Sequence, residues 1–342
     1  MKKAAALVST LVFPFVLWAA QSAPPLKLVA RYPMPVSANG RFDHLGVDLQ
    51  GNRLFLAAES MHCVLILDLH TGKNIGEIPG IQIPHAIFVR HDLNRIYITD
   101  GGAGTLGGVR VYDGTTLHQV AFIPLKRDTD SIAYDPKTKY LYVVNGGGDA
   151  NETFSMYSVI DTTQDTMLAE VKVDGDTLEA SAVDPSSPRI FVNNPAKNEV
   201  DVVNRDTRSV ESVWPIRMAT KNVAMALDNT GHRLFVACRS GKIVVLDSQT
   251  GRELQTLDIG KGVDDLIFDS ASRRIYASTG AGTGSTVVYE EQDPDHYQLL
   301  AEVATAPGAK NEVLVPELDR YFTVVPPTQS SGGFVYAYRV SQ

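Results

Sequence analysis

Short runs of alternating apolar and polar residues follow one another along the chain in a repeating order. The clearest copy starts with "SIAYD" at residues 131–135, passes through a polar turn into "YLYVV" at 140–144, and reaches "MYSVID" at 156–161 after a glycine-rich loop. A fourth run covers residues 169–173. Alternation with a period of two, without helical spacing, indicates β-strands. Each copy therefore predicts a four-stranded antiparallel meander.

This pattern occurs seven times, at a spacing of about 45 residues, and an apolar–aromatic pair marks each copy. The pairs are Leu54-Phe55, Ile96-Tyr97, Leu141-Tyr142, Ile190-Phe191, Leu234-Phe235, Ile275-Tyr276 and Tyr321-Phe322. One meander cannot bury both of its faces, whereas seven arranged radially cover one another in a closed ring. We therefore predict an all-β fold, a seven-bladed β-propeller of four-stranded antiparallel blades. A solenoid is the alternative, but it would need capping repeats, which we do not find in the sequence.

The two ends of the repeat region predict how the ring closes. Residues 26–36, "LKLVARYPMPV", precede the first full copy and read as a single strand. The seventh copy stops after its third strand, "GFVYAYRV", at residues 333–340. We expect the N-terminal strand to supply the missing outer strand of the last blade, so that both ends of the chain share one sheet.

The first residues have the layout of a secretory signal. Lys2 and Lys3 are followed by an apolar run at residues 4–20, and small residues surround a cleavage point between Ala19 and Ala23. We expect residues 1–23 to be a signal peptide, residues 24–342 to form the propeller, and the protein to be periplasmic or secreted by a bacterium. A retained membrane anchor is the alternative. No later segment resembles a membrane span.

Charge and cysteine content narrow the range of partners. Removal of the two lysines leaves 29 basic against 39 acidic residues, a charge of about −10, which makes nucleic acid an unlikely partner. Cys63 and Cys238 lie in copies far apart in the ring, so we interpret them as small buried apolar residues rather than a disulfide. The sequence has no CxxC and no HExxH motif.

The strand sequences carry a family resemblance. "RIYITD", "YLYVVN", "RIFVNN" and "RLFVAC", each followed by a run such as "VRVYD", "YSVID" or "IVVLD", resemble the YVTN-repeat β-propeller family, also called YncE-like or surface-layer-type propellers. The resemblance covers residues 26–340. It implies an exported propeller with a binding role or a place in a surface structure. It also implies a histidine at the start of the innermost strand, which here only His85 keeps.

The copies differ most at the start of the predicted innermost strand, five residues before its first turn. Asp43, His85, Asp130, Glu179, Val223 and Asp264 occupy this position, and the seventh copy offers Lys310, Asn311 or Glu312. We expect a ring of carboxylates around one mouth of the central channel, with the ligand-binding residues Asp43, His44, His85, Asp130, Glu179, Asn222, Asp264 and Asn311. Such a ring suits Ca²⁺ or another divalent cation, with Asp43, His85, Asp130, Glu179 and Asp264 as metal ligands. Turn-capping and solvation of a wide channel are the alternative reading.

Three glycine-rich loops are expected at the same mouth: "DGGAGTLGG" at 100–108, "NGGGDANETFS" at 145–155 and "TGAGTGS" at 279–285. Glycine lets a ligand approach the backbone closely, although flexible hairpin ends would look the same.

Because the sequence has no catalytic motif, we favour a monomeric binding module for a cation, a small molecule or a protein partner. A metal-dependent lactonase or lyase, with Glu179 or Asp130 as base and His85 as acid, is the second hypothesis. A surface-layer or adhesive component is the third.

Overall fold

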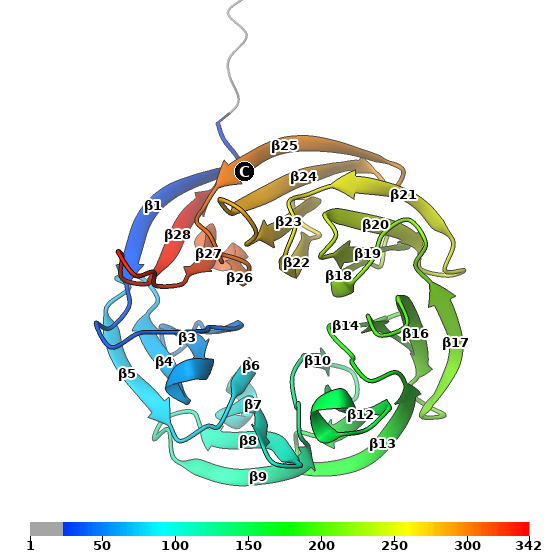
Figure 1. Cartoon of the computed structure of the whole chain (residues 1–342), viewed down its shortest axis with the longest axis horizontal. Helices are drawn as coiled ribbons and strands as arrows, with labels where there is room; N and C mark the ends of the chain where they lie inside the picture. The colour runs from blue at the N-terminus through cyan, green and yellow to red at the C-terminus, as the bar shows by residue number, and fades with distance from the viewer. Residues whose placement is uncertain (1–22, 342) are drawn as a thin grey trace, which may run out of the picture.

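The computed structural model describes residues 23–341 as seven four-stranded antiparallel sheets arranged around a central channel (Figure 1). This confirms the predicted seven-bladed β-propeller. The expected signal peptide, except for its last residue, lies outside the described residues. The helices of residues 23–341 are single 3₁₀ turns, Glu59–Met61, His91–Leu93, Gly147–Ala150 and Pro316–Leu318, and none has the length and apolar character needed to cross a membrane.

Each blade runs from an innermost strand at the channel to an outermost strand at the rim, and the blades are numbered here from the N-terminus. The innermost strands are β2 (Leu45–Asp48), β6 (Pro84–Arg90), β10 (Ile132–Asp135), β14 (Ser181–Val183), β18 (Asn222–Asp228), β22 (Val263–Asp269) and β26 (Glu312–Val315). The second strands are β3 (Arg53–Ala58), β7 (Arg95–Ala103), β11 (Tyr140–Gly146), β15 (Arg189–Asn194), β19 (Arg233–Cys238), β23 (Arg274–Thr279) and β27 (Arg320–Val325).

The third and fourth strands complete each blade toward the rim. The third strands are β4 (Cys63–Asp68), β8 (Leu106–Asp113), β12 (Phe154–Asp161), β16 (Glu199–Asn204), β20 (Lys242–Asp247), β24 (Ser285–Asp293) and β28 (Phe334–Val340). The outermost strands are β5 (Asn74–Pro79), β9 (Gln119–Lys126), β13 (Thr166–Asp174), β17 (Ser209–Pro215), β21 (Glu253–Asp258), β25 (His296–Ala304) and β1 (Leu26–Pro33).

The apolar–aromatic pairs of the second strands form the core between blades. Neighbouring residues of a strand point to opposite faces of its sheet, so each pair packs one side chain against each adjacent blade. Leu54 and Phe55, for example, are both fully buried. Tyr276 of blade 6 stacks on Tyr321 of blade 7 with ring centroids 5.7 Å apart, an offset arrangement that aromatic pairs favour. The repeated pair therefore joins the blades to one another as well as filling each sheet.

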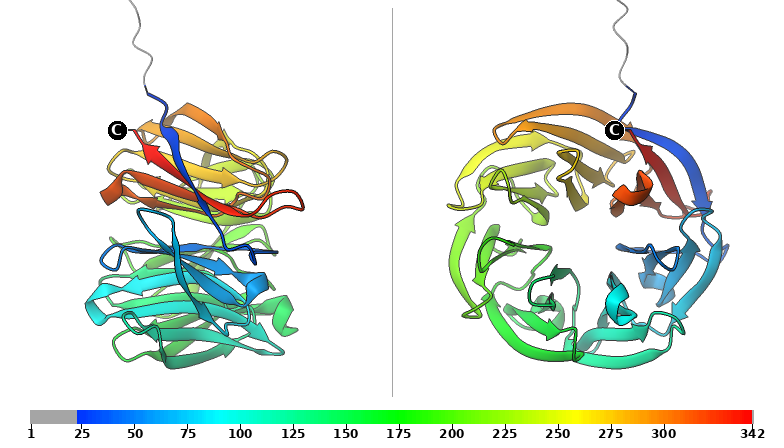
Figure 2. Two further views of the ribbon diagram at one scale, coloured as in Figure 1. Left: turned by 90° about the vertical axis from the view of Figure 1, so that its left-hand side faces the viewer. Right: turned by 180° about the vertical axis from the view of Figure 1, so that it is seen from behind.

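The N-terminal strand closes the ring as predicted. β1 pairs antiparallel with β28, so the last sheet has the order β1-β28-β27-β26 and contains both ends of the described chain (Figures 1 and 2). Leu26 is buried in one cluster with Tyr276, Tyr321 and Tyr338, which belong to blades 6 and 7. The strand ends at Pro33, three residues before the end of the predicted run. Closure is therefore secured by strand pairing and by apolar packing across the last seam.

Both cysteines are buried and free within the described part of the chain, in agreement with their interpretation as small apolar residues. Burial raises the pKa of Cys63 to about 11 and the pKa of Cys238 to about 12. A thiol with such a pKa stays protonated at neutral pH and is a poor nucleophile and a poor metal ligand. The two cysteines therefore contribute packing rather than chemistry.

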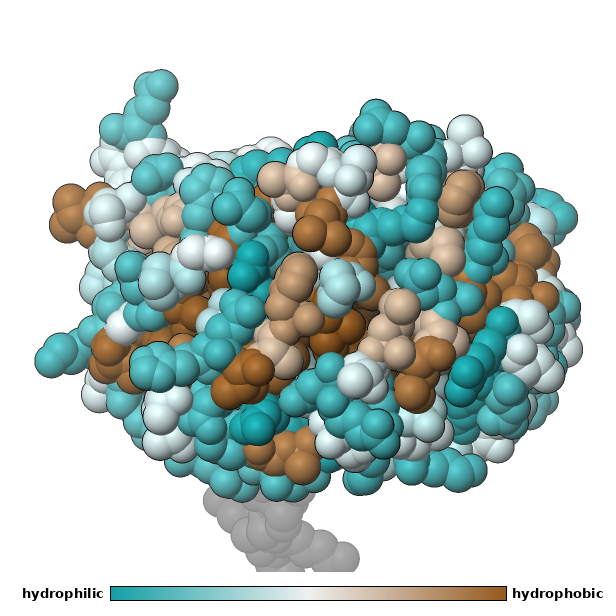
Figure 3. All heavy atoms as spheres, turned by 90° about the horizontal axis from the view of Figure 1, so that it is seen from below, coloured by the Kyte–Doolittle hydropathy of each residue, from teal (hydrophilic) through white to brown (hydrophobic). Residues whose placement is uncertain are grey.

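The outer rim is mixed in polarity. Figure 3 shows the rim from the side of β9 and β13, with apolar side chains lying among polar ones. Large apolar residues exposed on the outermost strands of blades 2 and 3 include Val120, Phe122, Met167 and Leu168. Singly exposed apolar residues are common on folded proteins. A cluster of charged side chains lies at one end of the channel.

Candidate functional site

The starts of the innermost strands meet at one mouth of the channel and line a cavity of about 300 Å³. The cavity wall includes Asp43, His85, Asp130, Glu179 and Asp264, which stand in different blades. The backbone explains how a sequence repeat places them together. The N–H groups of Asp43, Asp130 and Glu179 donate to carbonyls of the second strand of their own blades at 2.9–3.0 Å, in equivalent positions. The same local register therefore points each side chain at the same opening.

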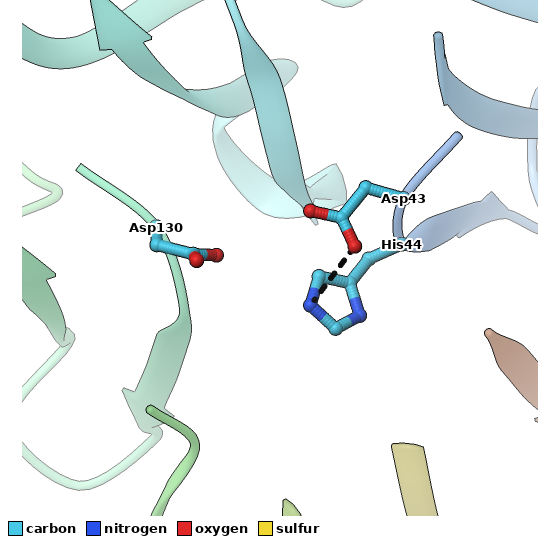
Figure 4. Close-up of side chains that lie close together, drawn as sticks. All are labelled: Asp43, His44 and Asp130. Carbon is cyan, nitrogen blue, oxygen red and sulfur yellow. Dashed lines mark ion pairs between the residues drawn. The ribbon is translucent and has the colours of Figure 1, made fainter. Parts of the chain in front are cut away.

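Asp130 points toward the channel axis and faces Asp43 and His44 from across the mouth, as Figure 4 shows. The dashed line in that figure marks the contact of 3.6 Å between His44 Nε2 and Asp43 Oδ1. On its other side, His44 places Nδ1 3.0 Å from Asp265 Oδ1. Burial alone would lower the pKa of His44, but Asp265 and Asp43 outweigh burial and hold that pKa well above the usual range.

His85 pairs with Asp43 across the seam between blades 1 and 2. Its Nδ1 lies 2.6 Å from Asp43 Oδ2 and 3.9 Å from Asp130 Oδ1. Burial would lower the pKa of His85, yet the charges of Asp130 and Asp43 raise it to about 10. Burial likewise opposes ionisation of Asp43, but His44 and His85 hold the pKa of that carboxyl well below its usual value. At neutral pH the pair is an imidazolium and a carboxylate.

Asp264 is neutralised by two cations. Arg239 Nη2 lies 2.6 Å from Asp264 Oδ1, and Lys310 Nζ donates to Asp264 Oδ2. Asn311 Nδ2 donates both to Asp264 Oδ2 and to Asp43 Oδ1, each at 3.2 Å. Burial opposes ionisation of Asp264, but Lys310 and other positive neighbours keep its pKa below the usual value. The part of the mouth formed by blades 5 to 7 therefore carries its own counter-charges.

Blades 3 and 4 have weaker compensation, since the positive groups nearest to Asp130 Oδ1 and Glu179 Oε1 are His85 at 3.9 Å and Arg239 at 3.6 Å. Asp130 Oδ1 is buried without a hydrogen-bond partner among the described residues. Burial and the charge of Asp130 raise the pKa of Glu179 to about 8. Burial, with Asp130 and Asp149, raises the pKa of Asp128 to about 6. This side of the mouth has more carboxylates than positive groups to pair with them.

Three overlapping triplets could hold a metal ion, with donor atoms within 4.8 Å of one another in each: Asp43–His44–Asp130, Asp43–Glu59–His85 and His85–Asp128–Asp130. Carboxylate oxygens suit Ca²⁺, and an added imidazole suits a transition metal. The two histidines are protonated, so a metal that used them would have to displace their protons. The carboxylates fit a cation more readily than the imidazoles do.

The same charges bear on acid–base chemistry. His85 is protonated and could donate a proton, as an acid must. Glu179 is also protonated at neutral pH, since its pKa is about 8, and cannot accept a proton in that state. A bound cation would lower the pKa of Glu179 and make it available as a base. With Glu179 as the base, the lactonase or lyase hypothesis therefore depends on a cation at the mouth.

Two of the expected binding residues do not line the cavity. Asn222 is fully buried, and its Nδ2 donates to Asn193 Oδ1 and to the Glu199 carbonyl, both at 2.8 Å. Its neighbour Val223 lines the cavity instead. Asn311 is also buried and connects Asp43 with Asp264. Both amides are therefore positioned to organise the mouth rather than to touch a ligand.

The loops supply lining residues that the strand pattern alone did not reveal: Arg41, Glu59, Asp128, Asp149, Thr177 and Arg239. Glu59, Asp149 and Arg239 belong to connections between second and third strands, which the repeat places at this face, so loop position was the available signal. Among the glycine-rich loops, 145–155 contributes Asp149 to the cavity wall. Gly101 of loop 100–108 lies against His85, where an added Cβ would come within 2.9 Å of Nε2.

Comparison with known proteins identifies the architecture and no more. No family model matches the chain, and no curated protein sequence matches it. Among solved structures, a chain of the Kuenenia stuttgartiensis hydrazine synthase aligns with a TM-score of 0.69 at 15% identity, over 91% of this chain and 96% of the other. A chain of a mitotic checkpoint complex aligns with a TM-score of 0.71 at 14% identity, over 98% of this chain and 100% of the other. At such identities the likeness is one of fold.

Proposed function

We propose that this seven-bladed β-propeller is an exported binding module, of the YVTN-repeat kind, that takes a small cationic ligand at its acidic channel mouth. Export rests on the signal-like residues 1–23 and family membership on the strand motifs. A propeller presents loops and strand starts from several blades to one opening, which suits it to binding.

One observation carries the proposal: Asp130 and Glu179 face the cavity without enough positive charge beside them. Asp130 Oδ1 has no hydrogen-bond partner in residues 23–341, and Glu179 is neutral at pH 7 because its pKa is about 8. A cation between them would restore the charge of Glu179 and give Asp130 a partner. The free energy lost in burying these carboxyl groups would then be recovered on binding, as is common where a site trades stability for function.

The ligand could be Ca²⁺, another divalent metal ion or a small organic cation, since all three supply the missing positive charge. Isothermal titration calorimetry with calcium chloride, manganese chloride, zinc chloride and methylammonium chloride distinguishes them. We expect at least one to bind the wild-type protein at pH 7, and the D130N/E179Q variant to lose that binding by at least tenfold.

Asp206→Asn is the matched control, because Asp206 is an exposed carboxylate in the turn between β16 and β17, at the end of the blade opposite the mouth. This variant removes the same unit of charge as Asp130→Asn and should bind as the wild type does. Failure of all four cations to bind the wild-type protein would overturn the proposed function. Equal binding by D130N/E179Q and wild type would overturn the assigned place of binding.

A further inference from the structure

A second cavity, of about 260 Å³, adjoins the mouth on the channel side. His44, Ser131 and Ala180 line both cavities, so the two spaces meet at these residues. Ser131 and Ala180 directly follow Asp130 and Glu179 in the chain. A molecule that reaches past the carboxyl groups of Asp130 and Glu179 therefore enters this second cavity, which we call the lower chamber.

Most of the residues that line the lower chamber are apolar, and about half of its exposed surface is apolar. Its wall includes Leu45, Ile87, Phe88, Ile132 and Met225, which come from the innermost strands of four blades or their starts. Phe88 is held in place by a ring contact with Tyr134 at a centroid distance of 4.6 Å. Leu45, Ile87 and Met225 are each less than a tenth exposed. Apolar groups that face a cavity bind another apolar group favourably, because both leave water.

Three polar side chains of the lower chamber, those of His44, Asp265 and Ser181, have polar partners within the protein. His44 Nδ1 lies 3.0 Å from Asp265 Oδ1, and Asp265 Oδ2 accepts a hydrogen bond from the Glu312 backbone N–H at 2.9 Å. The Ser181 hydroxyl oxygen lies 2.8 Å from the Tyr157 hydroxyl oxygen, within hydrogen-bond distance. Because the imidazolium and the carboxylate offset each other, the chamber carries little net charge. It therefore favours an uncharged group, in contrast to the mouth above it.

We propose that the ligand is an organic cation with an apolar body, whose charged head lies between Asp130 and Glu179 and whose alkyl or aryl group fills the lower chamber. This inference rests on the proposed function and specifies its ligand class. At about 30 Å³ per water-sized group, a chamber of 260 Å³ has room for about eight non-hydrogen atoms, the size of a hexyl or phenyl group with a short linker. A bare metal ion would leave this chamber unused.

Chain length tests the inference. Methyl-, ethyl-, butyl- and hexylammonium chloride are titrated into the full mature chain at pH 7 by calorimetry, with hexanol and hexanoate as uncharged and negative probes of equal length. Burial of a methylene contributes about 0.8 kcal/mol, so we expect affinity to rise by about fourfold per methylene through the series. Hexanol and hexanoate should each bind at least tenfold more weakly than hexylammonium.

Two substitutions within the chamber locate the apolar body. Met225→Gln keeps nearly the same shape, Ile132→Thr shortens the side chain by one methyl group, and both add polar atoms; both residues line the lower chamber and not the mouth. In the double variant we expect the gain per methylene to fall to about twofold or less, with methylammonium binding unchanged. Unfolding by urea, monitored in parallel, shows that the variant is folded.

The outcomes separate this inference from the proposed function. If methylammonium binds and longer chains bind no better, the apolar-body inference is wrong while the cation site stands. If chain length matters equally in wild type and in M225Q/I132T, the apolar group lies elsewhere and the inference is again wrong. If a metal ion binds and no alkylammonium does, the ligand is inorganic and only the proposed function survives. If no cation binds, both fail.

Discussion

Nδ1 of His85 lies 2.6 Å from Oδ2 of Asp43, and this contact joins the innermost strands of blades 1 and 2 at the channel mouth. Asn311 approaches the other oxygen of Asp43 from blade 7 and reaches on to Asp264 in blade 6. Asp43 is thus the carboxylate through which three blades are connected. The mouth is stabilised by contacts between blades as well as by the sheets themselves.

Replacement of Asp43 by asparagine should destabilise the protein. It leaves the buried imidazolium of His85 without its closest partner, a change that costs about 3 kcal/mol when one member of a buried ion pair is removed. Urea unfolding of D43N, H85Q and the double variant at pH 7 measures the coupling between them. We expect the double variant to be less destabilised than the sum of the two single variants. Strict additivity would show that the pair contributes nothing.

Replacement of Glu179 by glutamine should stabilise the protein at pH 8 and leave its stability unchanged at pH 4. The pKa of Glu179 is raised to about 8 in the folded state from 4.5, so its unfolded state ionises first as pH increases. The wild type therefore loses stability between pH 4.5 and 8, and the glutamine variant avoids this loss. Since the side chain is partly exposed, we expect about 2 kcal/mol at pH 8 by chemical denaturation. An equal difference at both pH values would contradict the assigned cause.

Replacement of Lys310 by methionine should strengthen cation binding. Lys310 is one of two cations that neutralise Asp264, and its removal makes the mouth more negative. Loss of one positive charge near the ligand should favour a cation by about 1 kcal/mol, or about fivefold in affinity. The effect should shrink as salt is added. Lys137→Met serves as the control, since Lys137 is exposed in the first turn of blade 3, away from the mouth, and should leave the affinity unchanged.

Two residues of the closing strand β1 are expected to differ in their contribution to stability. Leu26 is buried in the seam between blades 6 and 7, so Leu26→Ala should cost about 3 kcal/mol of stability. Val29 lies on the same strand but is 41% exposed, and Val29→Ala should cost less than about 0.5 kcal/mol. Thermal unfolding of both variants makes the comparison. Equal effects would mean that β1 does not hold the ring closed through this packing.

Much of the architecture is readable from the sequence because the fold is a repeat. The apolar–aromatic pairs mark each second strand, and antiparallel pairing then determines where the innermost strand starts. Counting back from the first turn was therefore enough to select Asp43, Asp130 and Glu179, whose backbone N–H groups bond in equivalent positions. The unpaired run before the first copy likewise predicted the closing strand, since a seventh blade with three strands lacks an edge partner.

The balance of positive and negative charges at the mouth could not be predicted from the sequence in the same way. Arg239 comes from a loop, and its reach to Asp264 depends on the path of that loop and not on strand register. Counting back from the first turn placed Val223 at the equivalent position of blade 5, and Val223 does line the cavity. Its polar neighbour Asn222, which we selected for its amide, instead turns into the protein and donates to Asn193 and to the Glu199 carbonyl. The uneven compensation of the carboxylates appears only once the blades are assembled.

The central claim is that the mouth lacks a positive charge, which a ligand supplies. The most direct measurement is the ¹³C NMR shift of the Glu179 carboxyl carbon at pH 7, followed while calcium chloride or hexylammonium chloride is added. Since the pKa of Glu179 is about 8, we expect the carboxyl to start largely protonated and to ionise as one of the two cations binds. A carboxyl that is already ionised in the free protein, or whose shift does not respond to either cation at saturation, would contradict the account.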